Sequence, residues 1–176
     1  MRALTLQGQR FRIEQLPDPI PTEGQILVAP IFNGICGSDL HQRAAMRAEE
    51  SLSSDPASLP KMVLGHEFCG EVVEVAPGTT TDLRRGDRVV GLPFTPGPDP
   101  LSLLTIGLTV ERSGGLADLS RLDAVRSFRV PASVSSDLAS LTEPLAVGRH
   151  AIGLANRFAG PNIILGCGPI GLAAIA

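Results

Sequence analysis

The segment GICGSDLH, residues 34–41, gathers four side chains that could do chemistry in a very short stretch. Cys36, Ser38, Asp39 and His41 fall within six residues, in a chain that has only three cysteines and three histidines. Cysteine and histidine are the usual zinc ligands. The spacing of Cys36 and His41 is that of a C-x4-H metal pair, so both, one or neither of them could hold a metal ion.

Further candidate metal ligands lie elsewhere in the chain, at the adjacent pair His66 and Glu67 and at Glu143. A catalytic zinc takes three protein ligands, drawn from cysteine, histidine and carboxylate, and keeps a fourth position open. Each candidate also has a structural alternative. Cys36 could be a core thiol, His66 a buried histidine with its hydrogen bonds satisfied, and Glu143 a charge at the start of a helix.

A glycine-rich turn near the end of the sequence indicates nucleotide binding. The apolar segment NIIL, residues 162–165, predicts a short strand, and a helical pattern begins at Pro169. Between them runs G-x-G-x-x-G, the fingerprint of a dinucleotide-binding turn, which would use Gly166, Gly168, Pro169, Ile170 and Gly171 to hold NAD or NADP. Gly166 would permit the turn, Gly168 would let a pyrophosphate approach, and Gly171 would let the helix pack closely. The alternative is a glycine-rich turn in an ordinary βα unit.

Short strands and turns must position these residues. RALTL, FRIEQL and QILVAPIF read as strands, as do the β-branched run after residue 61 and the segment after GDRV. This density of short strands predicts a β-rich, barrel-like domain. Residues 42–60 are polar without a steady period, which predicts a short helix followed by a surface loop. Apolar residues at helical spacing follow Ser133, and Pro144 fits the first turn of a second helix there.

Composition excludes several function classes. A net charge of −3 gives no electrostatic footprint for nucleic acid or an anionic membrane. The uncharged run 161–176 has sixteen residues, which is shorter than the about 20 that a membrane-spanning helix needs. An odd number of cysteines without a disulfide spacing points to a reducing compartment, so we expect a cytoplasmic protein.

Five motifs in this order, GICGSDLH, GHEFCGEVVEV, GDRV, TEPLAVGRHA and GCGPIGLA, resemble the zinc-dependent medium-chain alcohol and polyol dehydrogenases. The resemblance covers the chain except residues 42–60 and 92–113. It implies a mainly β fold, a GroES-like partly open β-barrel with a few helices, over residues 1–144. Residues 145–176 would then be a linking helix and the first βα unit of a Rossmann domain.

The resemblance also implies roles for the candidate residues. Cys36 and His66 match catalytic zinc ligands, and Glu67 matches a carboxylate that coordinates directly or stands just behind the metal. Glu143, in the Glu-Pro motif, resembles the remaining carboxylate, bound directly or through water. Asp39 matches the acid that orients the imidazole of His66.

The proton path implied by the resemblance runs from Ser38 to His41, which carry the alcohol proton to solvent, so His41 is not expected to bind the metal. The reaction would pass a hydride between an alcohol or polyol and NAD(P). Many relatives hold a second, structural zinc with four cysteines. No cysteine lies between Leu92 and Thr142, so we expect one catalytic zinc and no structural zinc.

Members of this family are longer, and the sequence ends inside the expected Rossmann unit. We therefore expect an N-terminal fragment that is inactive alone. Its 162–165 strand should be unpaired within its own nucleotide domain, and should be disordered, pack on the catalytic domain or join another chain. The full-length protein would form a homo-oligomer. Two alternatives stay open: a zinc-independent quinone or enoyl reductase of the same superfamily, and a non-catalytic GroES-like remnant.

Overall fold

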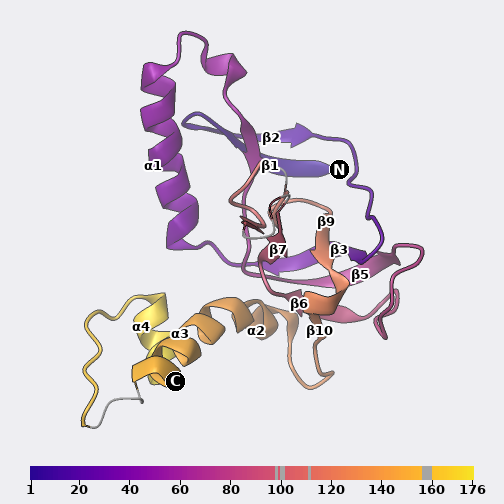
Figure 1. Ribbon diagram of the computed structural model, residues 1–176, viewed down its shortest axis with the longest axis vertical. Helices are drawn as coiled ribbons and strands as arrows, with labels where there is room; N and C mark the ends of the chain where they lie inside the picture. The colour runs from indigo at the N-terminus through magenta and orange to yellow at the C-terminus, as the bar shows by residue number, and fades with distance from the viewer. Residues whose placement is uncertain (98, 100–101, 111, 156–159) are drawn as a thin grey trace.

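Short antiparallel strands form most of the regular structure in the computed structural model, which describes residues 1–97, 99, 102–110, 112–155 and 160–176 (Figure 1). The N-terminal hairpin turns at Gly8, whose φ of +56° lies in the left-handed region that favours glycine. The hairpin strands and a later strand form a three-stranded sheet in the order β2-β1-β4. These strands are β1 (Arg2–Gln7), β2 (Arg10–Gln15) and β4 (Lys61–Val63).

A five-stranded antiparallel sheet, in the order β10-β6-β5-β3-β9, forms the centre of the molecule. Its strands are β3 (Gln25–Asn33), β5 (Phe68–Val75), β6 (Arg88–Gly91), β9 (Ser120–Asp123) and β10 (Ser127–Arg129). A separate ribbon pairs β7 (Phe94–Pro96) with β8 (Leu103–Thr105). Alternating apolar side chains of the large sheet point into one core, which includes Ile26, Val28, Val72, Val89 and Leu122.

The pairing of β3 with β5 brings two loops of the chain together. Its register shifts twice, between Leu27 and Val28 and again between Pro30 and Phe32, and Pro30 has no N–H to donate to the ladder. After the second shift, Asn33 at the end of β3 pairs with Phe68 at the start of β5. The segment that follows β3 and the segment that precedes β5 therefore lie side by side.

Helix α1 (Gly37–Leu52) starts inside the GICGSDLH segment and is longer than the short helix predicted there. It is polar over most of its length, but Met46 is buried against Leu6, Met62 and Leu64. That contact on the N-terminal sheet stabilises a helix whose sequence has little apolar periodicity. A 3₁₀ turn, η1 (Pro56–Ser58), follows α1, and a second, η2 (Ala124–Arg126), joins β9 to β10.

Three further helices lie at the opposite end of the molecule from the N-terminal hairpin, with the five-stranded sheet between them (Figure 1). They are α2 (Ser136–Ser140), α3 (Thr142–Ala155) and α4 (Pro169–Ile175). Pro144 lies in the first turn of α3, as predicted. The expected domain boundary at 144/145 falls inside this helix. None of the described helices is long and apolar enough to cross a membrane.

The strand predicted at 162–165 is wrong for this structure, because these residues have no regular secondary structure. Ile163 is 83% exposed and Leu165 is 92% exposed. A strand of this kind needs neighbours for its backbone hydrogen bonds, and no described strand lies beside it. The helix after the turn does form and packs against α3, where a Cβ at Gly148 would lie 2.6 Å from the Ala173 carbonyl carbon.

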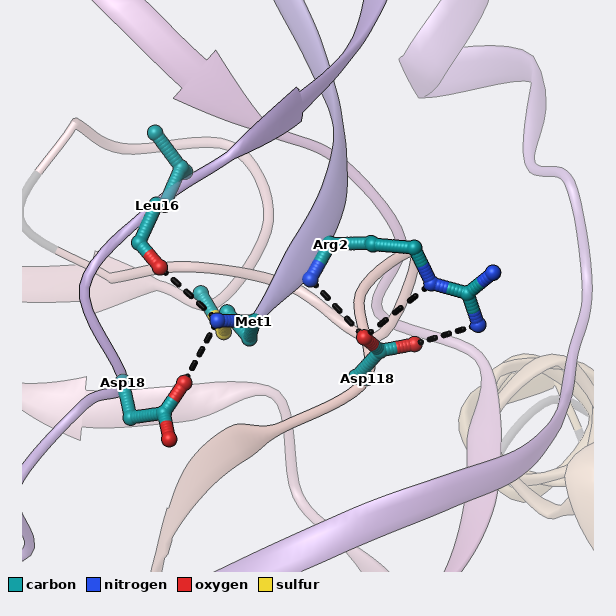
Figure 2. Close-up of polar contacts among 5 residues, drawn as sticks. All are labelled: Met1, Arg2, Leu16, Asp18 and Asp118. Carbon is teal, nitrogen blue, oxygen red and sulfur yellow. Dashed lines mark hydrogen bonds and ion pairs between the residues drawn. The ribbon is translucent and has the colours of Figure 1, made fainter.

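The first strand is fixed at its N-terminal end by polar contacts (Figure 2). The Met1 ammonium donates hydrogen bonds to the Leu16 carbonyl at 2.8 Å and to Asp18 at 2.5 Å. The Arg2 backbone N–H donates to the Asp118 carboxylate at 2.8 Å, and the Arg2 guanidinium contacts the same carboxylate. The Met1 contacts join the chain end to the segment that follows β2, and the Arg2 contacts join β1 to the segment that enters β9.

Candidate metal centre

Three of the predicted ligands come together in one group, formed by Cys36, His66 and Glu67, whose ligand atoms all lie within 4.8 Å of one another. Cys36 comes from the loop after β3 and is the N-cap of α1. His66 and Glu67 come from the loop between β4 and β5. The two loops are joined by a backbone hydrogen bond of 2.7 Å from the Gly34 N–H to the Glu67 carbonyl.

The chemistry of this group fits a zinc ion. A thiol, an imidazole and a carboxylate are the donors that zinc prefers. His66 and Glu67 are each 7% exposed, and no described ion pair involves Glu67. A buried carboxylate without a cationic partner is costly, and a bound cation would offset that cost. Cys36 is only half-buried, so the group is open to solvent on the thiol side.

Asp39 lies behind His66, on the first turn of α1. Its Oδ2 accepts a hydrogen bond of 2.9 Å from the Cys36 backbone N–H, and its Oδ1 lies 3.8 Å from Nδ1 of His66. Both of these facing atoms are buried and lack a hydrogen-bond partner. Because Nδ1 faces Asp39, the other ring nitrogen, Nε2, remains for a metal ion.

The two predicted proton-relay residues lie on the same helix. Ser38 is half-buried, and its Oγ lies 3.5 Å from Nε2 of His66. His41, one turn further along α1, is exposed. The structure therefore places Ser38 beside the group and His41 at the surface, and it shows no direct hydrogen bond between the two.

Glu143 lies near the group but outside it. It is half-buried in the first turn of α3. Burial raises the pKa of Glu143, the nearby His66 lowers it, and Glu67 raises it. These effects on its pKa show that Glu143 is close enough to sense both residues electrostatically. It also lines an apolar groove with Leu92, Phe94 and Phe128.

The two remaining cysteines lie outside the group. Cys69 is buried in a small core with Val130 and Ala139, and burial raises the pKa of its thiol. Cys167 is exposed in the glycine-rich turn. Cys69 therefore has the structural role of a core thiol.

The glycine-rich turn has part of the predicted geometry. Gly166 has a φ of +107°, and a Cβ at Gly171 would overlap the Gly166 carbonyl oxygen. Gly168 is the N-cap of α4, with Pro169 and Ile170 in its first turn. The turn is exposed and lacks the strand that would precede it in a complete nucleotide-binding unit.

Residues 22–132 match the family of the alcohol dehydrogenase GroES-like domain. The chain belongs to this family. The matched range contains Cys36, His66 and Glu67, whereas Glu143 and the glycine-rich turn lie beyond it. The predicted family and the mainly β, GroES-like fold are thereby confirmed.

Relatives in sequence include several dehydrogenases. The chain is 33% identical over 173 residues to an L-threonine 3-dehydrogenase of Bacillus licheniformis, which covers 93% of this chain and 48% of that protein. It is 35% identical to a sorbitol dehydrogenase of Gallus gallus, covering 92% of this chain and 47% of that protein. The chain spans about half the length of the curated relatives it matches.

Solved structures of several dehydrogenases share the fold of this chain. The NADP-bound structure of a candidate zinc-binding dehydrogenase from Sinorhizobium meliloti superimposes with a TM-score of 0.81 at 30% identity, over 99% of this chain and 51% of that one. The 2R,3R-butanediol dehydrogenase of Bacillus subtilis gives a TM-score of 0.76 at 29% identity, over 99% and 53% of the two chains.

Sequence reasoning missed the residues that pack against the start of the loop that carries His66 and Glu67. They are Asn33 and the pair Gly114 and Gly115, which pack around Gly65. The adjacent glycines were the one local signal, because neighbouring glycines often mark a close approach of two backbones. Asn33 offered no signal of its own.

Proposed function

We propose that this chain is the metal-binding catalytic part of a zinc-dependent oxidoreductase that transfers a hydride between an alcohol or polyol and NAD or NADP. The observation that carries the proposal is the convergence of Cys36, His66 and Glu67 within 4.8 Å. The related proteins are named for threonine, butanediol and sorbitol, which all carry a hydroxyl group on carbon. That shared chemistry supports an alcohol or polyol as the substrate class.

Cys36, His66 and one carboxylate would hold the zinc, which would supply Lewis-acid chemistry that lowers the pKa of a bound hydroxyl. Glu67 belongs to the group, and Glu143 lies within electrostatic reach of it. Glu67 is therefore the better candidate for direct coordination, and Glu143 for a contact through water. The apolar groove beside Glu143 would receive the carbon chain of the substrate.

The side chains of α1 would hold the imidazole and move the proton. Asp39 would orient His66 through Nδ1, which keeps Nε2 directed at the metal. Ser38 would accept the hydroxyl proton, and the exposed His41 would pass it to solvent. Gly166, Gly168, Pro169, Ile170 and Gly171 would receive the pyrophosphate of the nucleotide.

The activity, the substrates and the homo-oligomeric assembly of the whole protein belong to this proposal, because the chain spans about half of its relatives. The 176-residue chain alone should show no dehydrogenase turnover, since none of the strands that the structure describes lies beside its glycine-rich turn. A cytoplasmic location and one zinc per chain are also proposed. A zinc-independent reductase or a non-catalytic remnant would have no use for this ligand group.

The zinc content of the purified 176-residue chain tests the proposal. We expect about one zinc per chain, and loss of that zinc in Cys36→Ser, because the Cys36 thiolate would be one of the zinc ligands. The matched control is Cys167→Ser, which changes an exposed cysteine in the glycine-rich turn and should keep the zinc. Absence of zinc from the wild-type chain, or equal zinc in both variants, would contradict the proposal.

A further inference from the structure

Asn33, the last residue of β3, has an unusual environment for an amide side chain. Its Nδ2 donates a hydrogen bond to the carbonyl of the next residue, Gly34. Its Oδ1 is buried and has no hydrogen-bond partner. A buried acceptor without a partner loses the free energy of its hydration. The hydrogen bonds of this amide therefore do not explain why it is held in a buried position.

The amide of Asn33 fills a narrow space between two glycines. A Cβ at Gly65 would lie 2.7 Å from Oδ1 and 2.9 Å from Nδ2, and a Cβ at Gly115 would lie 2.5 Å from Oδ1. We call this space, bounded by Gly65 and Gly115, the carboxamide slot. Only residues without a side chain leave room for the amide at both walls, so the fit depends on both glycines.

The walls of the slot are fixed to each other by backbone hydrogen bonds. The Gly115 N–H donates to the Gly65 carbonyl at 2.8 Å, and the Leu116 N–H donates to the Leu64 carbonyl at 3.0 Å. The Leu4 N–H donates in turn to the Leu116 carbonyl at 2.8 Å. Asp118, two residues further, is held by Arg2 (Figure 2). Asn33 therefore inserts into a wall that is anchored to the N-terminal sheet.

Both ligand loops meet at the carboxamide slot. Asn33 comes three residues before Cys36, and Gly65 directly precedes His66 and Glu67. A Cβ at Gly34 would overlap Oε2 of Glu67, so the loop after β3 already touches the Glu67 carboxylate. The amide of Asn33, which extends from the segment that carries the thiol, thus packs against the backbone that carries the imidazole and the carboxylate.

We infer that Asn33 is a positioning residue of the metal centre, whose amide in the carboxamide slot sets the separation between the Cys36 loop and the His66–Glu67 loop. The inference rests on the proposed function, because it takes the group to be a metal site. Asn33 touches no ligand atom and acts through the backbones of Gly34 and Gly65. Its substitution should change the metal affinity and the coordination geometry rather than abolish the site.

Titration of the 176-residue chain with Co²⁺ measures both properties. Cobalt bound to a cysteine thiolate gives a charge-transfer absorption band whose position and intensity depend on the geometry of the site. We expect Asn33→Ala and the milder Asn33→Ser to bind Co²⁺ roughly ten- to a hundredfold more weakly, as is typical when a supporting residue of a metal site is lost. The band should also shift or lose intensity, because neither side chain spans the slot.

The matched control is Thr5→Val, which removes a buried hydroxyl of β1 that donates to Glu14 in the N-terminal sheet. It should lower the thermal unfolding midpoint but leave the Co²⁺ affinity and the band unchanged. Equal weakening by Thr5→Val would overturn the inference, because the effect would then follow general stability. Wild-type affinity and spectrum in a folded Asn33→Ser chain would overturn it too.

The Co²⁺ titration distinguishes a failure of this inference from a failure of the proposed function. If the wild-type chain binds Co²⁺ with a thiolate band that Cys36→Ser removes, the metal site stands whatever Asn33 does. If the wild-type chain binds no Co²⁺ and no zinc, the proposed function fails and the role of Asn33 falls with it. If only the Asn33 variants behave as wild type, the positioning role alone is refuted.

Discussion

The imidazole of His66 lies between two side chains of α1 that face different ring nitrogens. Asp39 Oδ1 lies 3.8 Å from Nδ1, and Ser38 Oγ lies 3.5 Å from Nε2. One helix turn can thus supply both an acid that orients the ring and a hydroxyl beside the nitrogen that would bind the metal. This arrangement explains why cysteine, serine and aspartate are packed so closely in GICGSDLH.

The substitution His41→Ala should leave the zinc in place. His41 is exposed on α1 and does not belong to the group of Cys36, His66 and Glu67. The zinc content should equal that of the wild type, and the unfolding free energy should change by no more than about 0.5 kcal/mol, as for most surface substitutions. Metal analysis and chemical denaturation measure the two quantities.

In a full-length enzyme, the same substitution should slow only the step that releases the proton, and the slowing should depend on pH and on added buffer. Cys36→Ala is the contrasting variant, which should abolish zinc binding. Loss of zinc from His41→Ala would mean that Cys36 and His41 form the C-x4-H pair after all.

The metal-binding residues of the candidate site could be predicted from the sequence, but the residues that pack against their loops could not. Cys36, His66 and Glu67 stand out because cysteine, histidine and carboxylate are the side chains that bind zinc. Asparagine is not among these zinc-binding side chains, so Asn33 does not stand out in the sequence. Its role depends on contacts with Gly65 and Gly115, which are distant in sequence, and no local pattern encodes those contacts.

At the element scale, the contact of α3 with α4 depends on Gly148. A Cβ there would lie 2.6 Å from the Ala173 carbonyl carbon, so Gly148→Val should force the two helices apart at a cost of about 1–3 kcal/mol. The amide protons of α4 should then exchange faster with solvent than in the wild type, which hydrogen-exchange mass spectrometry measures.

Gly153→Ala is the matched control for that substitution, because a Cβ at Gly153 would meet no described atom within 4 Å outside its chain neighbours and its own helix backbone. It should stabilise α3 by about 0.5–1 kcal/mol, since alanine favours the helix more than glycine does. Unchanged protection of α4 in Gly148→Val would show that α4 does not depend on this contact.

Elements that depend on their own sequence pattern were predicted well, and elements that depend on neighbours were not. The strands of the two sheets carry β-branched and alternating residues, and Pro144 marks the first turn of α3. The 162–165 segment has the same β-type composition but forms no strand, and no strand of the described residues lies beside it. Helix α1 was underestimated, since its support comes from contacts with the N-terminal sheet and hairpin turn, among them the buried Met46 and the hydrogen bonds of Arg43 and Glu50 to the Gln9 backbone.

At the scale of the whole molecule, ion pairs at the N-terminal strand should make stability depend on acid pH. Hydrogen bonds from the Arg2 backbone and guanidinium hold the pKa of Asp118 below its ordinary value. A carboxylate with a lowered pKa in the folded state stabilises the fold above its unfolded pKa of about 4, and this contribution is lost as pH falls through the folded pKa.

Thermal unfolding at a series of pH values tests this dependence. The midpoint of the wild type should fall below about pH 4, and Asp118→Asn should remove part of that fall. The effect should be small, because the pair is exposed to solvent. The difference in midpoint between wild type and Asp118→Asn should therefore shrink between neutral pH and about pH 3. A constant difference would contradict the role of this carboxylate.

The proposed metal site lies where two loops of the GroES-like domain meet. The loop with Cys36 joins β3 of the five-stranded sheet to α1, and the loop with His66 and Glu67 joins β4 of the three-stranded sheet to β5 of the five-stranded one. Since the family match spans residues 22–132, the ligand group lies inside the part of the chain whose family is shown. The glycine-rich turn and Glu143 lie outside it, and their roles follow from the proposed function.

X-ray absorption at the zinc edge of the zinc-loaded chain shows which atoms bind the metal. We expect one sulfur ligand at about 2.3 Å, from Cys36, and nitrogen or oxygen ligands at about 2.0–2.1 Å, from His66 and a carboxylate. In Cys36→Ser the sulfur contribution should vanish, and in Cys167→Ser it should persist. A spectrum of the wild-type chain with nitrogen and oxygen ligands alone would contradict the proposed metal centre.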